Sequence, residues 1–209
     1  MTGLLLLGGI GCEGVGGDGE DVPDQAVAGT ELCGGDAMSA EASRALKVIT
    51  GSSRFEASGE EYSVEQAAAL LAEAWPSSVI REDVCRIYTA ADAPDFELRV
   101  TWSLVDGPPT GRPAAKYTPL KMGERAGAAA DKAYVQFECR SNRFGTAEAE
   151  AHIFLSVERG GMPVEPEGDV EALKDAYATV AHSVSLAMAK ELRCENNGGL
   201  PERPVLDPA

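Results

Sequence analysis

Five cysteines and two histidines are the side chains of this chain best suited to bond formation, metal binding or proton transfer. The cysteines are widely spaced, and no two have the short spacing typical of a zinc site, so neither a metal nor another cofactor is predicted. Widely spaced cysteines favour disulfides, which persist in oxidising compartments outside the cytoplasm. Because five is an odd number, one cysteine needs another use. They are Cys12, Cys33, Cys85, Cys139 and Cys194.

The start of the chain offers a use for Cys12. Four leucines at positions 4–7 are followed by Gly-Gly-Ile-Gly-Cys, a run too short to span a bilayer. Residues 1–12 resemble the end of a bacterial lipoprotein signal peptide, in which the cysteine after a small residue is lipidated. The resemblance implies a membrane-anchored or secreted extracytoplasmic protein with a lipid on Cys12.

The signal departs from the usual pattern in two ways. Gly9 stands where a leucine is usual, and no Lys or Arg precedes the leucines. We therefore expect the true translation start to lie further upstream. The alternative is a frayed apolar N-terminus in which Cys12 is a free thiol.

Neither histidine belongs to a catalytic pattern. Period-two alternation puts His152 on a strand, on the face opposite to Ile153 and Leu155. His182 is expected on the outward side of the last helix, beside Ser183 and Ser185. We interpret both histidines as solvated or hydrogen-bonded surface residues, so no catalytic residue is predicted and a non-enzyme is favoured.

The aromatic side chains give no stronger signal for a ligand. Trp75 and Trp102 are expected to be core or rim residues rather than platforms for sugars.

Length and net charge limit the number of domains and the classes of partner that the chain can have. The 209 residues fit one domain, residues 33–195, between an acidic, Gly-rich flexible tether at 13–32 and a C-terminal tail at 196–209. The net charge of −16 argues against a nucleic-acid partner and against charge-driven adsorption to an anionic membrane.

Hydrophobic periodicity predicts an α+β fold. Ser39 and Gly51 bracket a first helix, and a capping box at Ser63 opens a second helix that Pro76 ends. Alternating residues then predict an antiparallel sheet of about four strands with one face buried and one wet or lightly covered. A long C-terminal helix should cover the buried face of this sheet, and two N-terminal helices should precede the sheet along the chain. The strands are expected near residues 84–88, 96–104, 134–139 and 153–157, and the last helix at 168–194.

The connection from residue 105 to 131 is the best candidate for a binding surface. It shows no regular pattern, and long loops of this kind are usually functional or disordered. It carries a local basic excess in an acidic protein, and the alternative is a mobile flap whose charges pair with the acidic body. Its candidate binding residues are Arg112, Lys116, Tyr117, Lys121 and Arg125.

With Cys12 lipidated, the other four cysteines allow three pairings. Cys139 should share the inward face of its strand with Phe137, and the last helix should pack there and end at Cys194. This favours the pairs Cys139–Cys194 and Cys33–Cys85.

The chain from about residue 33 onward resembles a family of uncharacterised secreted lipoproteins of high-GC actinobacteria. The residues that carry the resemblance are Cys33-Gly-Gly, the segment 45–51 and, above all, residues 181–201, from Ala-His-Ser-Val-Ser to Gly-Leu-Pro. It implies an envelope location and no chemistry.

Three functions remain open on the sequence. The first is a membrane-anchored binding or interaction module for an envelope protein or a small ligand. The alternative is a cell-envelope hydrolase with an unrecognised acidic active site. The third is a structural or antigen-like surface protein.

Overall fold

The computed structural model describes residues 26–59, 61–77, 79–146, 149–162 and 164–209. The predicted signal at 1–12, with Cys12, and most of the predicted tether lie outside these residues. Residues 26–32 were assigned to the tether but are folded, because Leu32 is completely buried beside Cys33. No helix in the described ranges is long and apolar enough to cross a bilayer.

The fold is mixed α+β with antiparallel sheets. Three helical segments precede the main sheet: the 3-10 helix η1 (Gly29–Gly34), α1 (Ala40–Thr50) and α2 (Val64–Ala74). A small sheet pairs β1 (Val27–Ala28) with β2 (Arg54–Phe55). The main sheet contains β3 (Val79–Tyr88), β4 (Glu97–Val105), β5 (Thr118–Leu120), β6 (Arg125–Ala129), β7 (Lys132–Arg140) and β8 (Glu150–Arg159). The chain ends with α3 (Val170–Glu191) and η3 (Glu195–Gly199).

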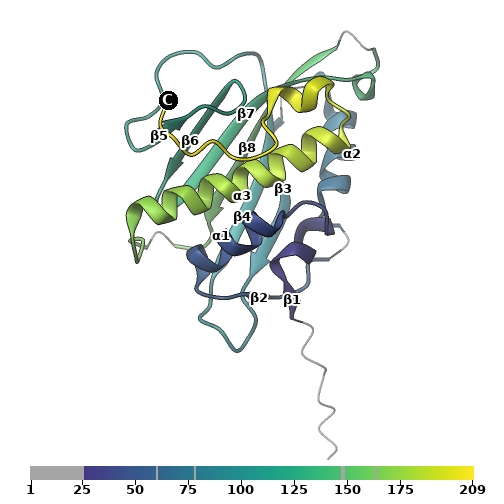
Figure 1. The fold of residues 1–209 in the computed structure, drawn as a ribbon. Helices are drawn as coiled ribbons and strands as arrows, with labels where there is room; N and C mark the ends of the chain where they lie inside the picture. Colours follow the sequence, from purple (N-terminus) through teal and green to yellow (C-terminus); the bar gives the residue numbers. More distant parts are fainter. Residues whose placement is uncertain (1–25, 60, 78, 147–148, 163) are drawn as a thin grey trace, which may run out of the picture.

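The main sheet and α3 form two layers (Figure 1). The strand order is β3-β4-β8-β7-β6-β5, and every neighbouring pair is antiparallel. Helix α3 packs against β6, β7 and β8, while α1 and α2 pack against α3. The core therefore lies between the sheet and α3 and extends under the N-terminal helices.

Helices α1 and α2 begin directly after their capping residues, Ser39 and Ser63. The Ser39 hydroxyl accepts the Ala42 N–H at 3.0 Å, and the Ser63 hydroxyl accepts the Gln66 N–H at 3.2 Å. Gly51 ends α1 in a left-handed conformation, which costs glycine less than other residues.

The predicted count of four strands was wrong. The connection from 105 to 131 contains β5 and β6, and the alanines after Arg125 form most of β6. Alanine has weak strand propensity, so its period-two signal is faint, and the tertiary contacts decide. Ala126 and Ala128 face the core, where small side chains let α3 approach the sheet.

The strand order also explains why the outer face of the sheet is less exposed than expected. The chain leaves β4 beside β8 and joins β5 at the far edge, so residues 106–117 must cross the sheet. The Arg125 guanidinium donates to the carbonyls of Pro109, Thr110 and Gly111 at 3.2, 3.2 and 2.8 Å. This crossing segment covers the outer face beside β6 and β7.

The predicted exposure of the His182–Ser185 face of α3 was wrong. His182 is only 2% exposed and Ser185 is fully buried. The Ser183 hydroxyl donates to the Ala37 carbonyl and accepts the Ser39 N–H, both at 2.9 Å. The helix is buried on both sides, because the start of α1 and the C-terminal tail cover the side away from the sheet.

The C-terminal tail is tied to the domain along its length. The His182 Nε2–H donates to the Pro201 carbonyl at 2.8 Å, and Leu200 is buried. The Ala209 N–H donates to the Pro119 carbonyl at 2.9 Å and extends the edge of β5.

His182 makes the stability of the fold depend on pH. Burial lowers the pKa of His182 below its ordinary value of 6.5, so the folded state favours the neutral imidazole. The unfolded chain then binds the proton more tightly than the folded protein does. The free energy of unfolding is therefore highest above the pKa of His182 in the unfolded chain, and it falls as the pH drops through the pKa of His182 in the folded protein. Urea unfolding from about pH 7.5 to about pH 5 should show this loss.

The matched variant is His182→Gln, which keeps an N–H donor for Pro201 but cannot be protonated. Its unfolding midpoint should change less with pH than that of the wild type. Equal pH dependence in the two proteins would contradict the assignment to His182.

Two disulfides cross-link the domain, in the pairing that the sequence analysis favoured. Cys33–Cys85 joins η1 to β3, and Cys139–Cys194 joins β7 to the end of α3, with Cα–Cα distances of 5.5 and 4.9 Å. These bonds indicate folding in an oxidising, extracytoplasmic compartment.

Candidate functional site

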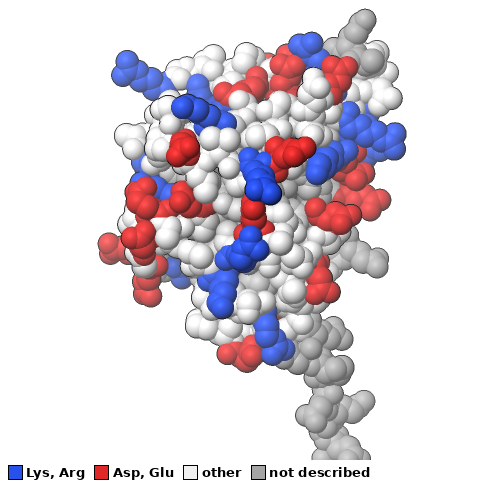
Figure 2. All heavy atoms as spheres, viewed as in Figure 1, with Lys and Arg blue, Asp and Glu red and all other residues white. Residues whose placement is uncertain are grey.

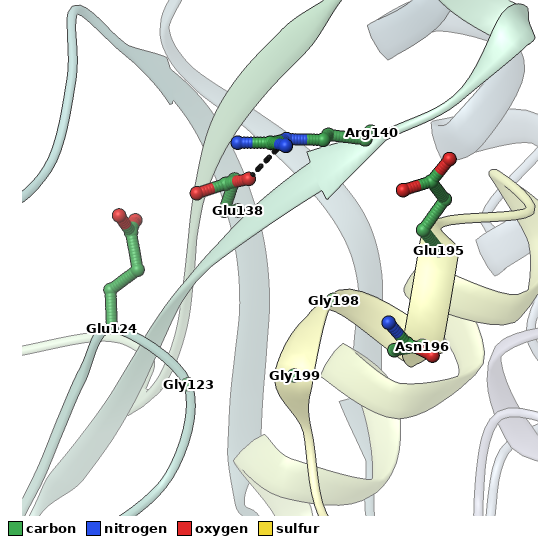
Figure 3. Close-up of a pocket in the computed structure, with 8 residues that line it drawn as sticks. All are labelled: Gly123, Glu124, Glu138, Arg140, Glu195, Asn196, Gly198 and Gly199. Atoms are coloured by element: carbon green, nitrogen blue, oxygen red, sulfur yellow. Dashed lines mark ion pairs between the residues drawn. The ribbon is translucent and has the colours of Figure 1, made fainter. Parts of the chain in front are cut away.

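Two pockets open at the same end of the main sheet, where β4 and β7 end and β8 begins. The first, here called the end groove, has a volume of about 440 Å³. It lies between the end of β7, the β5–β6 turn and η3 (Figure 3). Its charged lining is Glu124, Glu138, Arg140 and Glu195.

Figure 3 shows how the end groove distributes these charges. Glu124 and Glu195 lie on opposite sides, and the Glu138–Arg140 ion pair, 2.7 Å from Nε to Oε1, lies between them. The charges of Glu138 and Glu150 raise the pKa of Arg140, so its guanidinium stays protonated.

The second pocket, here called the tryptophan pocket, has a volume of about 220 Å³. It lies between the residues that follow α2 and the adjoining ends of β4 and β8. Trp75 and Leu104 supply apolar lining, and polar groups come from Ser77, Asp106, Glu150 and His152. Trp75 is held partly by Phe144, with ring centroids 5.8 Å apart.

His152 links the two pockets. Its Nδ1 lies 3.0 Å from the Glu124 carboxylate of the end groove, and its Nε2 lies 3.3 Å from Glu150 of the tryptophan pocket. Glu150 in turn accepts from Arg140 at 3.0 Å. The pockets are therefore joined by one continuous network of side chains. His152 lies on the predicted sheet face and is hydrogen-bonded, but at 9% exposure it is more enclosed than a surface residue.

Backbone conformation shapes one wall of the end groove. Asn196, Asn197 and Gly198 are consecutive left-handed residues, with φ of 50°, 53° and 67°. Asparagine tolerates this conformation better than most residues. The Cys139–Cys194 disulfide holds the start of this turn against β7.

Gly198 and Gly199 provide a matched test of that wall. Both have a positive φ, so alanine at either is strained, by about 1 kcal/mol. Only at Gly198 would a Cβ also collide with its surroundings, 2.9 Å from the Glu138 carbonyl and 2.7 Å from Phe137, whereas at Gly199 it meets nothing within 4 Å.

We expect Gly198→Ala to lower the free energy of unfolding by about 2–4 kcal/mol, through strain plus overpacking. Gly199→Ala should lower it by about 1 kcal/mol. Urea denaturation of the two variants measures the difference, and equal effects would show that β7 and η3 do not touch as described.

The basic residues of the predicted binding loop do not converge on one site. Arg125 is used to hold the crossing segment, and Tyr117 packs edge-on against Tyr134 with ring centroids 4.9 Å apart. Lys116 lies over the Tyr117 ring at 5.1 Å. Arg112 and Lys121 are exposed. Their role in binding stays a prediction.

Sequence reasoning missed the network around His152. Its members come from the β5–β6 turn, the end of β7 and the start of β8, three separate stretches of the chain between residues 124 and 152. The pairing of Glu138 with His152 across β7 and β8 could have been found only with the strand register.

The charges on the face that carries α3 are mixed. Figure 2 shows acidic and basic side chains interspersed there, so this face offers no broad patch of one sign for a charged polymer. In the part of the chain that the structure describes, no group of three or more His, Cys, Asp or Glu side chains could hold a metal ion.

Comparisons with protein-family models, with curated proteins and with solved structures found no match to this chain.

Proposed function

We propose that this protein is an extracytoplasmic, lipid-anchored binding module whose ligand site is the pair of joined pockets. The observation that carries the proposal is their position, at the end of the sheet farthest from the point where the N-terminal segment joins the domain.

The strand pairing establishes these opposite ends. Val27 pairs with Phe55, which forms a bridge with Thr89 at the end of β3. The pockets lie at the other end, at Val105 and Arg140, where β4 and β7 stop. Nine-residue strands such as these are about 30 Å long. A lipid on Cys12 would thus leave the pockets at the end of the sheet that faces away from the membrane.

The compartment supports the same proposal. The two disulfides require an oxidising environment, and a lipid on Cys12 would account for the fifth cysteine. On the residues quoted above, we also propose membership of the actinobacterial secreted lipoproteins.

Mass spectrometry of the mature protein tests the anchor. The expected N-terminal residue is Cys12 carrying acyl chains, and Cys12→Ser should move the protein from the membrane fraction to the culture medium. An unmodified Cys12 in the mature protein would rule out the anchor.

Retention of envelope material tests the binding site. The immobilised domain is exposed to solubilised envelope polymers, and the bound material is identified by mass spectrometry. Arg140→Ala should lose this material, because it removes the guanidinium between Glu138 and Glu150. Arg143→Ala is the matched control, because Arg143 is exposed and makes no ion pair among the described residues. Equal retention by both variants would count against the pockets.

A hydrolase is the second candidate, favoured by the three carboxylates on the end groove. Pairs of carboxyl groups across a groove can serve as acid and base or nucleophile. Purified protein should then release soluble fragments from envelope polymers. Glu195→Gln should abolish the release and the exposed control Glu202→Gln should not. No release by the wild type would reject this function.

A further inference from the structure

The segment 200–209, here called the strap, connects the two walls of the end groove. It begins directly after η3, which forms one wall. It ends beside β5, where the Ala209 N–H donates to the Pro119 carbonyl at 2.9 Å. Strand β5 leads into the turn that carries Gly123 and Glu124, which form the opposite wall. Figure 1 shows this path in yellow, from η3 past α3 to β5.

The far half of the strap is held weakly. The Val205 N–H donates to the Met122 sulfur at 3.4 Å, and a thioether sulfur is a poor acceptor. The side chains of Val205 and Leu206 are only partly buried against the core. A segment held in this way opens at a lower cost in free energy than the whole domain unfolds.

Like charges also oppose the docking of the strap on α3. Burial, followed by the charges of Glu171 and Asp207, raises the pKa of Asp175 above its ordinary value of 3.8. Asp207 belongs to the strap, whereas Asp175 and Glu171 belong to α3. The end of the strap therefore meets electrostatic repulsion at neutral pH, which favours its release.

His182 lies under the near half of the strap. Its Nε2–H donates to the Pro201 carbonyl at 2.8 Å, so the proton that acid adds goes to Nδ1, inside the domain. Burial lowers the pKa of His182 despite the Pro201 hydrogen bond and the charge of Glu41 on α1, and Lys190 lowers it further. Release of the strap removes this cover, so the open form takes up the proton more readily than the closed form.

We propose that the strap keeps the end groove in shape and is released by acid, when His182 takes up a proton. Release separates η3 from the β5–β6 turn, so the groove loses its shape and holds its ligand less tightly. The Cys139–Cys194 disulfide keeps the start of η3 on β7, so the opening is local and reversible. The effect on the ligand rests on the proposed function, whereas the opening itself does not.

Hydrogen exchange at the Val205 and Ala209 amides measures the opening. If His182 has its ordinary pKa of about 6.5 in the open form, the opening constant rises up to about tenfold from about pH 7.5 to about pH 5.5. Protection factors, which remove the intrinsic pH dependence of exchange, should fall by that factor in the wild type. In His182→Gln they should stay within about twofold.

A second variant tests the strap without changing a buried residue. Asp207→Asn, at an exposed position, removes the repulsion from Asp175 and should raise the protection of the strap amides at both pH values. Glu202→Gln removes a charge of the same sign at another exposed position of the strap and should match the wild type. Protonation of Asp175 or Asp207 would tighten the strap, so these groups cannot cause a loss of protection in acid.

Two amides in the walls of the groove report on its shape. The Glu124 N–H donates to the Gln136 carbonyl at 2.8 Å, and the Asn197 N–H donates to the Cys194 carbonyl at 3.1 Å. Both should lose protection in parallel with the strap when the pH falls. Strap amides that respond while these two do not would overturn the proposed link between strap and groove. An equal response of wild type and His182→Gln would overturn the role of His182.

Retention of solubilised envelope polymers tests the effect on the ligand. The wild type should lose more retention than His182→Gln between about pH 7.5 and about pH 5.5, because the apparent affinity follows the closed fraction. Equal losses would overturn the effect of the strap on the ligand. No retention by either protein at either pH would overturn the proposed function alone, because hydrogen exchange measures the strap without a ligand.

Discussion

Removal of the Cys139–Cys194 disulfide, by substituting both cysteines with alanine, is expected to lower the free energy of unfolding by about 4 kcal/mol. The bond closes a loop with a sequence separation of 55, which restricts the unfolded chain. For a domain of this size, the melting temperature should fall by about 10 °C. Urea and thermal denaturation of the oxidised wild type and the double variant give these values.

The Cys33–Cys85 pair is the matched control for loop closure, since its sequence separation of 52 predicts a loss of similar size. Only the Cys139–Cys194 variant should also disturb the end groove, because Cys194 leads directly into η3. Amide hydrogen exchange at residues 195–199 should therefore be faster in that variant alone. A free energy of unfolding within about 1 kcal/mol of the wild type would show that the cross-link does not stabilise the domain.

Ser185→Asp should destabilise the protein by at least about 3 kcal/mol and could prevent folding, because it buries a charge without a partner. Ser185 is fully buried, on the side of α3 that periodicity assigned to solvent. The control is Ala172→Asp, at an exposed position of the same helix, where the free energy should change by less than about 0.5 kcal/mol.

Circular dichroism during urea unfolding measures both α3 variants. If Ser185→Asp is as stable as Ala172→Asp, this side of the helix faces water and the packing of α1 and the tail against it is wrong. Ser185→Ala distinguishes charge burial from loss of the hydroxyl, and it should be nearly neutral because that hydroxyl has no hydrogen-bond partner in the described structure.

The candidate site was the part least accessible from sequence. Cysteine spacing argued against a zinc site, and the charge argued against nucleic acid, but neither pointed to the pockets. Glu124, Arg140 and His152 are ordinary polar residues in their local sequence. Their contacts depend on the register of β7 against β8 and on the turn that carries Glu124, which local patterns do not encode.

The sequence alone determined the features that depend on a short stretch of chain or on a choice among few possible pairings. The caps at Ser39 and Ser63 and the stripe of α3 follow from short-range hydrogen bonding and helical period. The favoured disulfide pairing followed because few cysteines were available and Cys139 had to face the helix that ends at Cys194.

Only the tertiary structure decided the strand order, the burial of His182 and the place of the pockets. Because the start of α1 and the C-terminal tail pack against α3, a residue of α3 that points away from the sheet need not face water. Periodicity shows that a helix has two faces but not what covers each one. The outward face of α3, the most distinctive stretch of the chain, is therefore a packing surface, and the candidate ligand site lies at the end of the sheet.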